Sequence, residues 1–109
     1  MEDRDKKPGI SDEELYRLKA IVSPVAEKYG VERMWLFGSR ARGDARPDSD
    51  YDFLISEGEI QSLFVLGGLL GDLEGVVGTK VDLASITNND REFLEEARKD
   101  EVLLYERAR

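Results

Sequence analysis

Two short features that lie close together carry the residue types needed for phosphoryl chemistry. The first is a Gly-Ser pair, Gly38 and Ser39, which follows the apolar run Met-Trp-Leu-Phe. Glycine lacks a Cβ, so the backbone can turn sharply there, and free N–H groups at a helix start attract phosphate. The second is Asp50 and Asp52, whose spacing sends both carboxylates to one face of a strand. A phosphate-binding turn beside paired carboxylates indicates metal-assisted phosphoryl transfer.

Taken alone, each feature has a simpler explanation. Ser39 would then be only the N-cap of a helix, and the two aspartates would lie on the solvent face of a strand. Aspartate is a poor strand former, however, so two of them among apolar neighbours need a reason. Close carboxylates raise each other's pKa unless a cation lies between them, and Mg²⁺ prefers carboxylate and phosphate oxygens. We therefore expect Asp50 and Asp52 to bind Mg²⁺.

A third carboxylate, Asp82, lies between Val81 and Leu83 in a later apolar run. If this run forms the neighbouring strand, three carboxylates can hold two Mg²⁺ ions about 3.5–4 Å apart, the separation used in two-metal catalysis. The chain has no histidine, so Asp82 is also the best candidate for the general base. A local hydrogen bond at a strand end explains Asp82 equally well when it is considered alone.

Three arginines, Arg40, Arg42 and Arg46, form a local basic cluster in an acidic chain. The planar guanidinium group matches phosphate oxygens, so Arg40 and Arg42 are candidate nucleotide-binding residues. Solvated surface arginine is the simpler reading for Arg46. The segment is not a Walker A loop, because the Gly-Lys-Ser/Thr ending is missing.

Composition narrows the classes of function. The 109 residues fit one domain, and 24 acidic against 16 basic residues give a net charge of −8. Such a charge disfavours direct binding to nucleic acid or to anionic membranes. Cysteine and histidine are both absent, which excludes disulfides, thiolate or imidazole metal sites and a Ser-His-Asp triad. We expect a cytoplasmic protein, because no apolar run approaches membrane-spanning length and the N-terminus is too charged for a secretory signal.

Helical and strand periodicities alternate along the chain, which predicts an α/β fold with a single small mixed β-sheet flanked by helices. Residues 1–10 are expected to be a flexible N-terminus. Pro24 lies inside the first helical pattern and is expected to kink or split that helix. The predicted elements are a helix over 12–29, strands over 31–37, 51–56 and 80–85, a helix over 60–73 and a helix capped by Thr87 or Asn88 that runs to 98. Residues 102–105 are expected to form a short strand, with a continuing helix as the alternative.

The run Leu63-Phe64-Val65-Leu66 leaves little room for a polar face on its helix. One interpretation is that a partner protein covers one side of the helix. A deeply buried core helix is an equally good interpretation, and self-association of the chain would explain the same residues.

The order Gly38-Ser39, then Asp50-x-Asp52, then Asp82 in a following strand resembles the nucleotidyltransferase superfamily that shares the DNA polymerase beta palm. The longer pattern Gly-Ser-Arg-Ala-Arg-Gly, followed by Ser-Asp-x-Asp, resembles its minimal nucleotidyltransferase (MNT) branch. The resemblance covers most of the chain and implies one MNT domain over residues 11–109. It implies that Gly38 and Ser39 hold the triphosphate of ATP and that the three aspartates bind Mg²⁺, with Asp82 activating the acceptor hydroxyl.

The activity implied by this resemblance is transfer of AMP from ATP to a hydroxyl group. Larger relatives carry a further substrate-binding domain, so a separate polypeptide is expected to complete the acceptor site. Minimal relatives often pair with a HEPN-domain ribonuclease toxin, and the resemblance therefore implies an antitoxin that modifies a toxin tyrosine. The alternatives are an antitoxin that only masks its partner and a transferase that acts on a small molecule such as an aminoglycoside.

Overall fold

The computed structural model describes residues 9–60, 62–87 and 89–108. Its four strands form one sheet in the order β3-β2-β1-β4. β1 pairs antiparallel with both β2 and β4, whereas β2 and β3 are parallel. The sheet is therefore mixed and small, which confirms the predicted fold class. The elements are α1 (Asp12–Lys28), β1 (Arg33–Phe37), α2 (Gly38–Arg42), β2 (Tyr51–Ser56), α3 (Leu63–Val77), β3 (Val81–Ser85), α4 (Arg91–Arg98) and β4 (Val102–Glu106).

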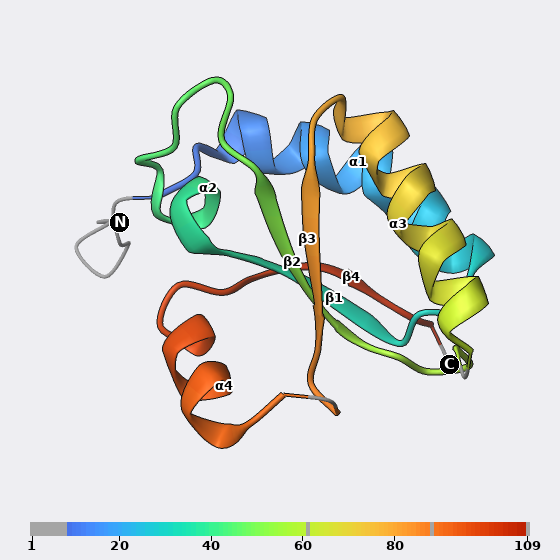
Figure 1. Cartoon of the computed structure of the whole chain (residues 1–109). Coiled ribbons are helices and arrows are strands. Elements are labelled where there is room, and N and C mark those ends of the chain that lie inside the picture. The colour runs from blue at the N-terminus through green and yellow to red at the C-terminus, as the bar shows by residue number, and fades with distance from the viewer. Residues whose placement is uncertain (1–8, 61, 88, 109) are drawn as a thin grey trace.

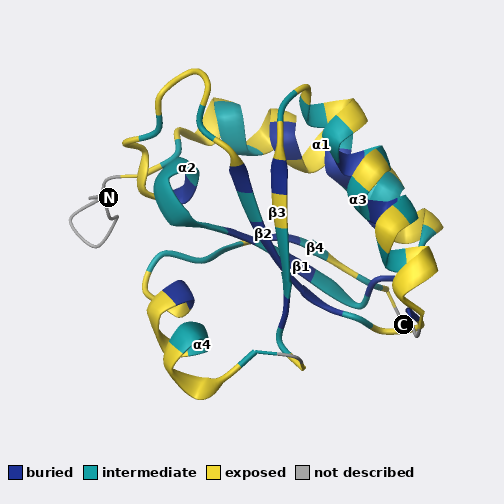
Figure 2. Ribbon diagram, viewed as in Figure 1, coloured by how far each residue is buried: buried dark blue, intermediate teal, exposed yellow. Residues whose placement is uncertain are grey.

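The hydrophobic core lies between one face of the sheet and the helices α1 and α3 (Figure 1). In β2, Tyr51, Phe53 and Ile55 belong to this core, so the side chain of Asp52 leaves the sheet on the opposite face. Figure 2 shows the buried residues concentrated on the sheet and on the inner sides of α1 and α3. α4 lies on the other side of the sheet, the side to which Asp52 points.

Helix α1 runs through Pro24 as one element, so the expected split at this residue is wrong. Proline removes one backbone N–H and leaves the carbonyl four residues earlier without its helical partner. Both Pro24 and Ala20 are exposed, so water can satisfy that carbonyl and the helix continues. The N-terminus of α1 is capped by Ser11, whose hydroxyl accepts a hydrogen bond from the Glu14 N–H at 3.1 Å.

The starts of α3 and α4 differ from the predictions. α3 begins at Leu63 rather than at residue 60, because the Ser62 hydroxyl accepts from the Val65 N–H at 3.2 Å and caps the helix there. The cap of α4 is Asp90, whose carboxylate accepts from the Phe93 N–H at 2.8 Å. Thr87 is therefore not the cap, and its hydroxyl donates to Glu57 instead. The other predicted cap, Asn88, lies outside the described residues.

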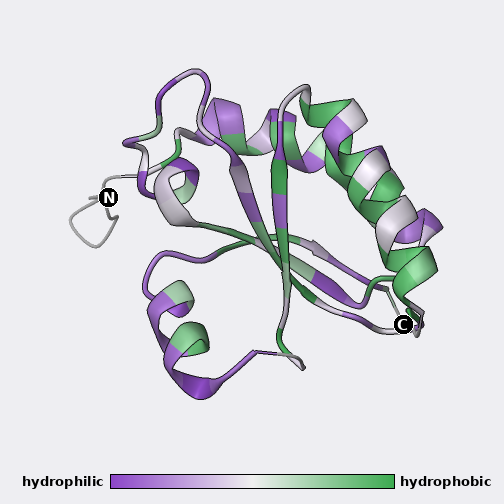
Figure 3. Cartoon of the chain, in the orientation of Figure 1, coloured by the Kyte–Doolittle hydropathy of each residue, from purple (hydrophilic) through white to green (hydrophobic). Residues whose placement is uncertain are grey.

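The apolar run at the start of α3 divides between surface and core. Leu63 is 84% exposed and Phe64 is 92% exposed, whereas Leu66 packs against the core and Leu69 is fully buried. Figure 3 shows the hydrophobic residues that extend along α3. The interpretation as a deeply buried core helix is therefore confirmed only for the inner side of α3, whereas covering by a partner or by a second copy stays a prediction for the exposed Leu63 and Phe64.

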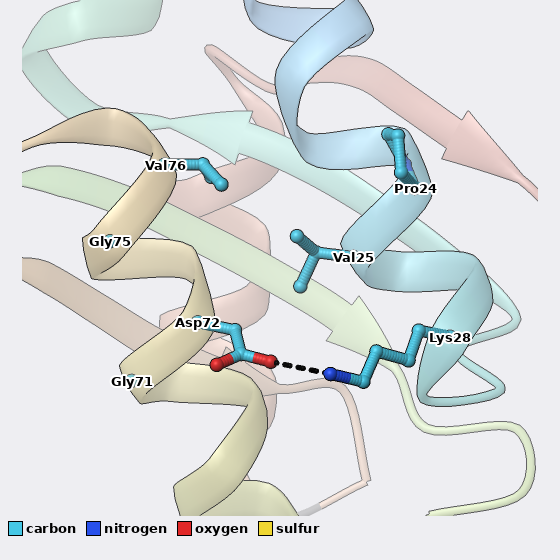
Figure 4. A pocket seen from close by; sticks show the side chains of 7 residues that line it. All are labelled: Pro24, Val25, Lys28, Gly71, Asp72, Gly75 and Val76. Atoms are coloured by element: carbon cyan, nitrogen blue, oxygen red, sulfur yellow. Dashed lines mark hydrogen bonds and ion pairs between the residues drawn. The ribbon is translucent and has the colours of Figure 1, made fainter.

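An ion pair ties α1 to α3 at the outer surface. Lys28 Nζ lies 3.2 Å from Asp72 Oδ2 (Figure 4). The Tyr29 hydroxyl donates to the same carboxylate oxygen at 2.7 Å. The two helices enclose a shallow groove of about 350 Å³ here, lined by Pro24, Val25, Lys28, Gly71, Asp72, Gly75 and Val76. This groove lies on the helical side of the sheet and is separate from the predicted catalytic residues.

Residues 1–8 of the predicted flexible N-terminus lie outside the described residues. Ile10, at the end of that segment, donates its N–H to the Ala41 carbonyl at 3.1 Å and packs against the core. None of the described helices is long and apolar enough to cross a membrane.

Candidate active site

Three neighbouring strands bring the central residues of the site into one row. In the strand register, Phe37 of β1 lies opposite Asp52 of β2, and Asp52 lies beside Asp82 of β3. The three residues share the sheet face that α1 and α3 do not cover, because the core residues of β2 alternate with Asp52. β3 is an edge strand, and Asp82 on it is exposed. The predicted adjacency of Asp52 and Asp82 is thus present in the structure.

Gly38 allows the Asp52 carboxylate to lie directly against the backbone. Its φ angle is +77°, in the left-handed region that residues with a Cβ rarely adopt. A Cβ at this position would overlap the Oδ2 atom of Asp52 and would lie only 3.1 Å from its Cγ atom. Both the backbone angle and the space therefore require glycine where β1 turns into α2.

The environment of Asp52 disfavours its charged form. Burial raises the pKa of Asp52 to about 6, with further contributions from a hydrogen bond to Asp82 and from the negative charges of Asp82 and Asp50. The positive charge of Arg42 acts in the opposite direction but is the smallest contribution to this pKa. A proton held by Asp52 and donated to Asp82 relieves the repulsion between two neighbouring carboxylates. A divalent cation relieves the same repulsion, so this pair of oxygen donors fits Mg²⁺.

Asp50 stands apart from the pair formed by Asp52 and Asp82. It precedes β2, is exposed, and acts on Asp52 through its charge. Among the described residues, no three His, Cys, Asp or Glu side chains gather closely enough to form a metal-binding group. The structure therefore brings together two of the three predicted metal ligands and places the third nearby.

Ser39 lies in the first turn of α2, directly after Gly38, which lies against the Asp52 carboxylate. The N-cap of this helix is Phe37, which provides no side-chain hydrogen bond to the first N–H groups. Ser39 is therefore not the N-cap, and the simpler explanation for it is wrong. Its carbonyl accepts hydrogen bonds from the N–H groups of Gly43 and Asp44, which close the short helix.

The two candidate nucleotide-binding arginines point to different places. Arg40 donates hydrogen bonds to the carbonyls of Pro47 and Ser49, so most of its guanidinium group is engaged with the loop before β2. Arg42 lies on the catalytic side, where it pairs with Asp44 and with Asp100 at 3.2 Å each. Arg46, expected to be a solvated surface residue, is exposed.

A hollow of about 210 Å³ lies beside Gly38, between α2 and α4. The rings of Phe37 and Phe93 meet edge to face at its base, with centroids 5.7 Å apart. The sequence predicted that Phe93 faces inward but gave no sign of the ion pair between Arg42 and Asp100, because its members are 58 residues apart. The hollow is lined by Phe37, Gly38, Arg42, Phe93, Glu96, Ala97 and Asp100.

Several known proteins are related to this chain in sequence or in fold. The chain is 41% identical over 66 residues to the protein adenylyltransferase MntA of Thermococcus cleftensis, which covers 61% of this chain and 67% of that protein. A toxin-antitoxin structure with AMP-PNP aligns with a TM-score of 0.71 at 15% identity, over 82% of this chain and 73% of that one. A structure of a tri-AMPylated HEPN toxin with an MNT antitoxin from Shewanella oneidensis aligns with a TM-score of 0.67 at 13% identity, over 85% and 73% of the two chains.

At such low identity the two structural likenesses concern the fold. The family described as "Polymerase beta, Nucleotidyltransferase" matches residues 19–109, which include Gly38, Ser39 and all three aspartates. The chain therefore belongs to the polymerase beta nucleotidyltransferase family and is a nucleotidyltransferase.

Proposed function

We propose that this nucleotidyltransferase transfers AMP from ATP to a tyrosine hydroxyl of a HEPN ribonuclease toxin and thereby acts as its antitoxin. The observation that carries the proposal is the hydrogen-bonded pair Asp52 and Asp82 directly beside the Gly38 turn. The likeness to MntA, whose name describes protein adenylyltransfer, supports a protein acceptor. The MNT antitoxin structure with a tri-AMPylated HEPN toxin supports the identity of the partner and of the transferred group.

Residues of the turn and the strands take separate roles in this reaction. Gly38 and Ser39 bind the triphosphate at the first turn of α2, where the N–H groups lack a side-chain cap. Asp50, Asp52 and Asp82 supply the oxygen ligands for two Mg²⁺ ions. The bound metal lowers the repulsion between the triphosphate and the incoming oxygen and stabilises charge on the leaving pyrophosphate.

In the proposed reaction Asp82 accepts the proton of the acceptor hydroxyl. The hydroxyl oxygen forms a bond to the α-phosphorus of ATP, the bond from that phosphorus to the bridging oxygen breaks, and pyrophosphate leaves. The hydroxyl proton passes to the carboxylate of Asp82, since the chain has no imidazole. The exposed position of Asp82 on an edge strand gives a hydroxyl from another polypeptide access to it.

The proposal is tested by measuring whether the mass of the partner protein increases by AMP. A candidate HEPN toxin, sought in the reading frame next to the one for this chain, is incubated with this chain, ATP and Mg²⁺ and is analysed by intact-mass spectrometry. We expect a mass increase of one or more AMP units, which is absent with a chelator or with Asp82→Asn. Neutralisation of the toxin without any change in mass would instead identify a masking antitoxin. Unchanged mass together with continued toxicity would overturn both assignments.

Ser39 provides a narrower test of the triphosphate site. We expect Ser39→Ala to weaken ATP binding by a factor of about 10 to 100, because one hydrogen bond to a charged group contributes about 1.5–3 kcal/mol. The melting temperature without ATP should stay the same, because Ser39 is not the helix cap. Calorimetric titration with ATP and thermal denaturation without it measure the two quantities. A large drop in melting temperature with unchanged ATP affinity would show that the hydroxyl serves the fold.

A further inference from the structure

Arg40 makes a set of contacts that surrounds one predicted metal ligand. Its Nη2 atom donates to the Ser49 carbonyl at 2.7 Å and to the Pro47 carbonyl at 3.1 Å, and its Nε atom lies 3.3 Å from the Ser49 carbonyl. Its guanidinium carbon also lies 4.1 Å from the centre of the Tyr51 ring. Ser49 and Tyr51 are the immediate neighbours of Asp50, so Arg40 holds the chain on both sides of that aspartate.

Asp50 needs such support because the sheet does not hold it. β2 begins at Tyr51, whose N–H donates to the Lys80 carbonyl. Residues 46–49 of the loop before it form a local turn, in which Arg46 and Ser49 bond to each other. Asp50 is exposed and stands apart from the pair of Asp52 and Asp82. The position of its carboxylate therefore depends on the backbone of residues 47–51, which Arg40 fixes.

Arg40 also faces away from the catalytic side of the sheet. It lines a hollow of about 400 Å³ near the start of α1, together with the buried Tyr51, whose ring belongs to the core side. Asp52, the next residue of β2, points to the opposite face. Arg42, in contrast, lies on the side of Asp52, because its charge lowers the pKa of that carboxyl group. The two arginines of the motif therefore cannot serve the phosphates equally.

We propose that Arg40 is a positioning residue that holds the backbone on both sides of Asp50, so that metal binding by Asp50 together with Asp52 and Asp82, rather than nucleotide binding, depends on it. Arg40 belongs to the same short helix as Gly38 and Ser39. Its side chain therefore links the turn proposed to bind the triphosphate to the loop that carries Asp50. The inference rests on the proposed function, in which Asp50 is a metal ligand.

The direction in which Mn²⁺ affinity changes when Arg40 is replaced separates a positioning role from a simple effect of its charge. Removing a positive charge near carboxylates should tighten cation binding, because a cation is repelled less. If Arg40 positions Asp50, however, Arg40→Gln should weaken binding of Mn²⁺ about tenfold, as is typical when a group that orients a ligand is lost. Arg40→Lys should weaken it by a similar factor, because a single ammonium group does not reproduce the planar fork that contacts two carbonyls and a ring.

The experiment measures two binding constants without any turnover. Free Mn²⁺ is titrated by electron paramagnetic resonance in the absence of nucleotide, and ATP binding is measured by equilibrium dialysis in the presence of a chelator. We expect both Arg40 variants to lose Mn²⁺ affinity and to keep metal-free ATP affinity within about twofold. Arg46→Gln is the matched control, since it removes a charge from the same loop without touching those carbonyls, and it should not weaken Mn²⁺ binding.

Several results would overturn the inference. Weaker metal-free ATP binding with unchanged Mn²⁺ binding would make Arg40 a phosphate ligand, as the sequence pattern first predicted. Unchanged binding of both would leave it as a purely structural residue. Hydrogen exchange of the Tyr51 amide reports whether the backbone of residues 47–51 becomes mobile in the Arg40 variants. Thermal denaturation shows which of the two variants remains folded, so that Arg40→Lys can be used if Arg40→Gln unfolds. A wild-type chain that binds neither Mn²⁺ nor ATP would refute the proposed function itself, a separate outcome.

Discussion

Asp52→Asn is expected to reduce AMP transfer by at least about 1,000-fold while it makes the metal-free protein more stable. The loss follows because a metal ligand contributes several kcal/mol to stabilisation of the transition state, and each 1.36 kcal/mol corresponds to a factor of ten. The gain follows because the folded protein holds the Asp52 carboxyl group in surroundings that disfavour its charge. Asparagine carries no charge, and its amide can donate to Asp82 as the protonated carboxyl group does.

The gain in stability depends on pH with a definite sign. The folded-state pKa of Asp52 is raised from 3.8 to about 6, so the folded protein binds more protons than the unfolded chain within this interval. Wild-type stability therefore falls as pH rises from about 4 to about 6, and the full penalty remains above that range. Allowing for solvent screening, we expect Asp52→Asn to raise stability by about 1 kcal/mol near pH 7.5, or a few degrees in melting temperature, and by much less near pH 5.

Thermal denaturation at both pH values, with and without Mg²⁺, measures these effects. Mg²⁺ should stabilise the wild-type protein but not Asp52→Asn, because a ligand stabilises only the folded state that binds it. Asp48→Asn removes a charge from the exposed loop before β2 and serves as the control. If Asp52→Asn destabilises the metal-free protein near pH 7.5, then the carboxylate is not held in an unfavourable environment, and its pairing with Asp82 needs another explanation.

Gly38→Ala is the second substitution with a large expected effect. Alanine in the left-handed region costs about 1–2 kcal/mol, and here the new methyl group would also displace the Asp52 carboxylate. We expect a folded but destabilised protein that has lost transfer activity and Mg²⁺-dependent stabilisation. Chemical denaturation and the intact-mass assay of the partner measure the two losses.

Gly78→Ala separates the backbone effect from the clash. Gly78 has a φ angle of +82°, close to that of Gly38, but a Cβ there would meet no atom within 4 Å. This control should lose about 1–2 kcal/mol of stability and keep its activity. Adding Asp52→Ala to Gly38→Ala should recover the part of the stability that the clash removed. If Gly38→Ala and Gly78→Ala lose equal stability and both remain active, the contact between Gly38 and Asp52 is unimportant.

The sequence predicted the sheet better than it predicted the helix ends. β2 occupies residues 51–56 as expected, because the aromatic and aliphatic residues on both sides of Asp52 favour a buried strand. The starts of α3 and α4 were misplaced because several polar residues near each start can cap a helix. In the structure Ser62 caps α3 and Asp90 caps α4. Which polar residue becomes the cap depends on how the preceding loop, which includes the buried Ile60 before α3, packs against the sheet.

Periodicity likewise predicted that Asp52 would share a face with Asp82 if their strands were neighbours. It could not predict the direction of Arg40, because residues on a helix of five residues have no repeating face. That direction depends on the carbonyls of the loop and on the Tyr51 ring, which only the folded chain brings together. The same holds for Asp100, whose contact with Arg42 is set by the packing of α4.

The place of Asp82 on the border of the sheet has a consequence for selectivity. A small substrate is usually chosen by a pocket that encloses it, but Asp82 is open to solvent and the hollow beside Gly38 measures only about 210 Å³. With Asp82 as the proposed general base, we expect the fit between two protein surfaces to select the acceptor and to bring one hydroxyl to the exposed carboxylate. Changing residues around that contact should redirect the enzyme to new targets without altering its chemistry.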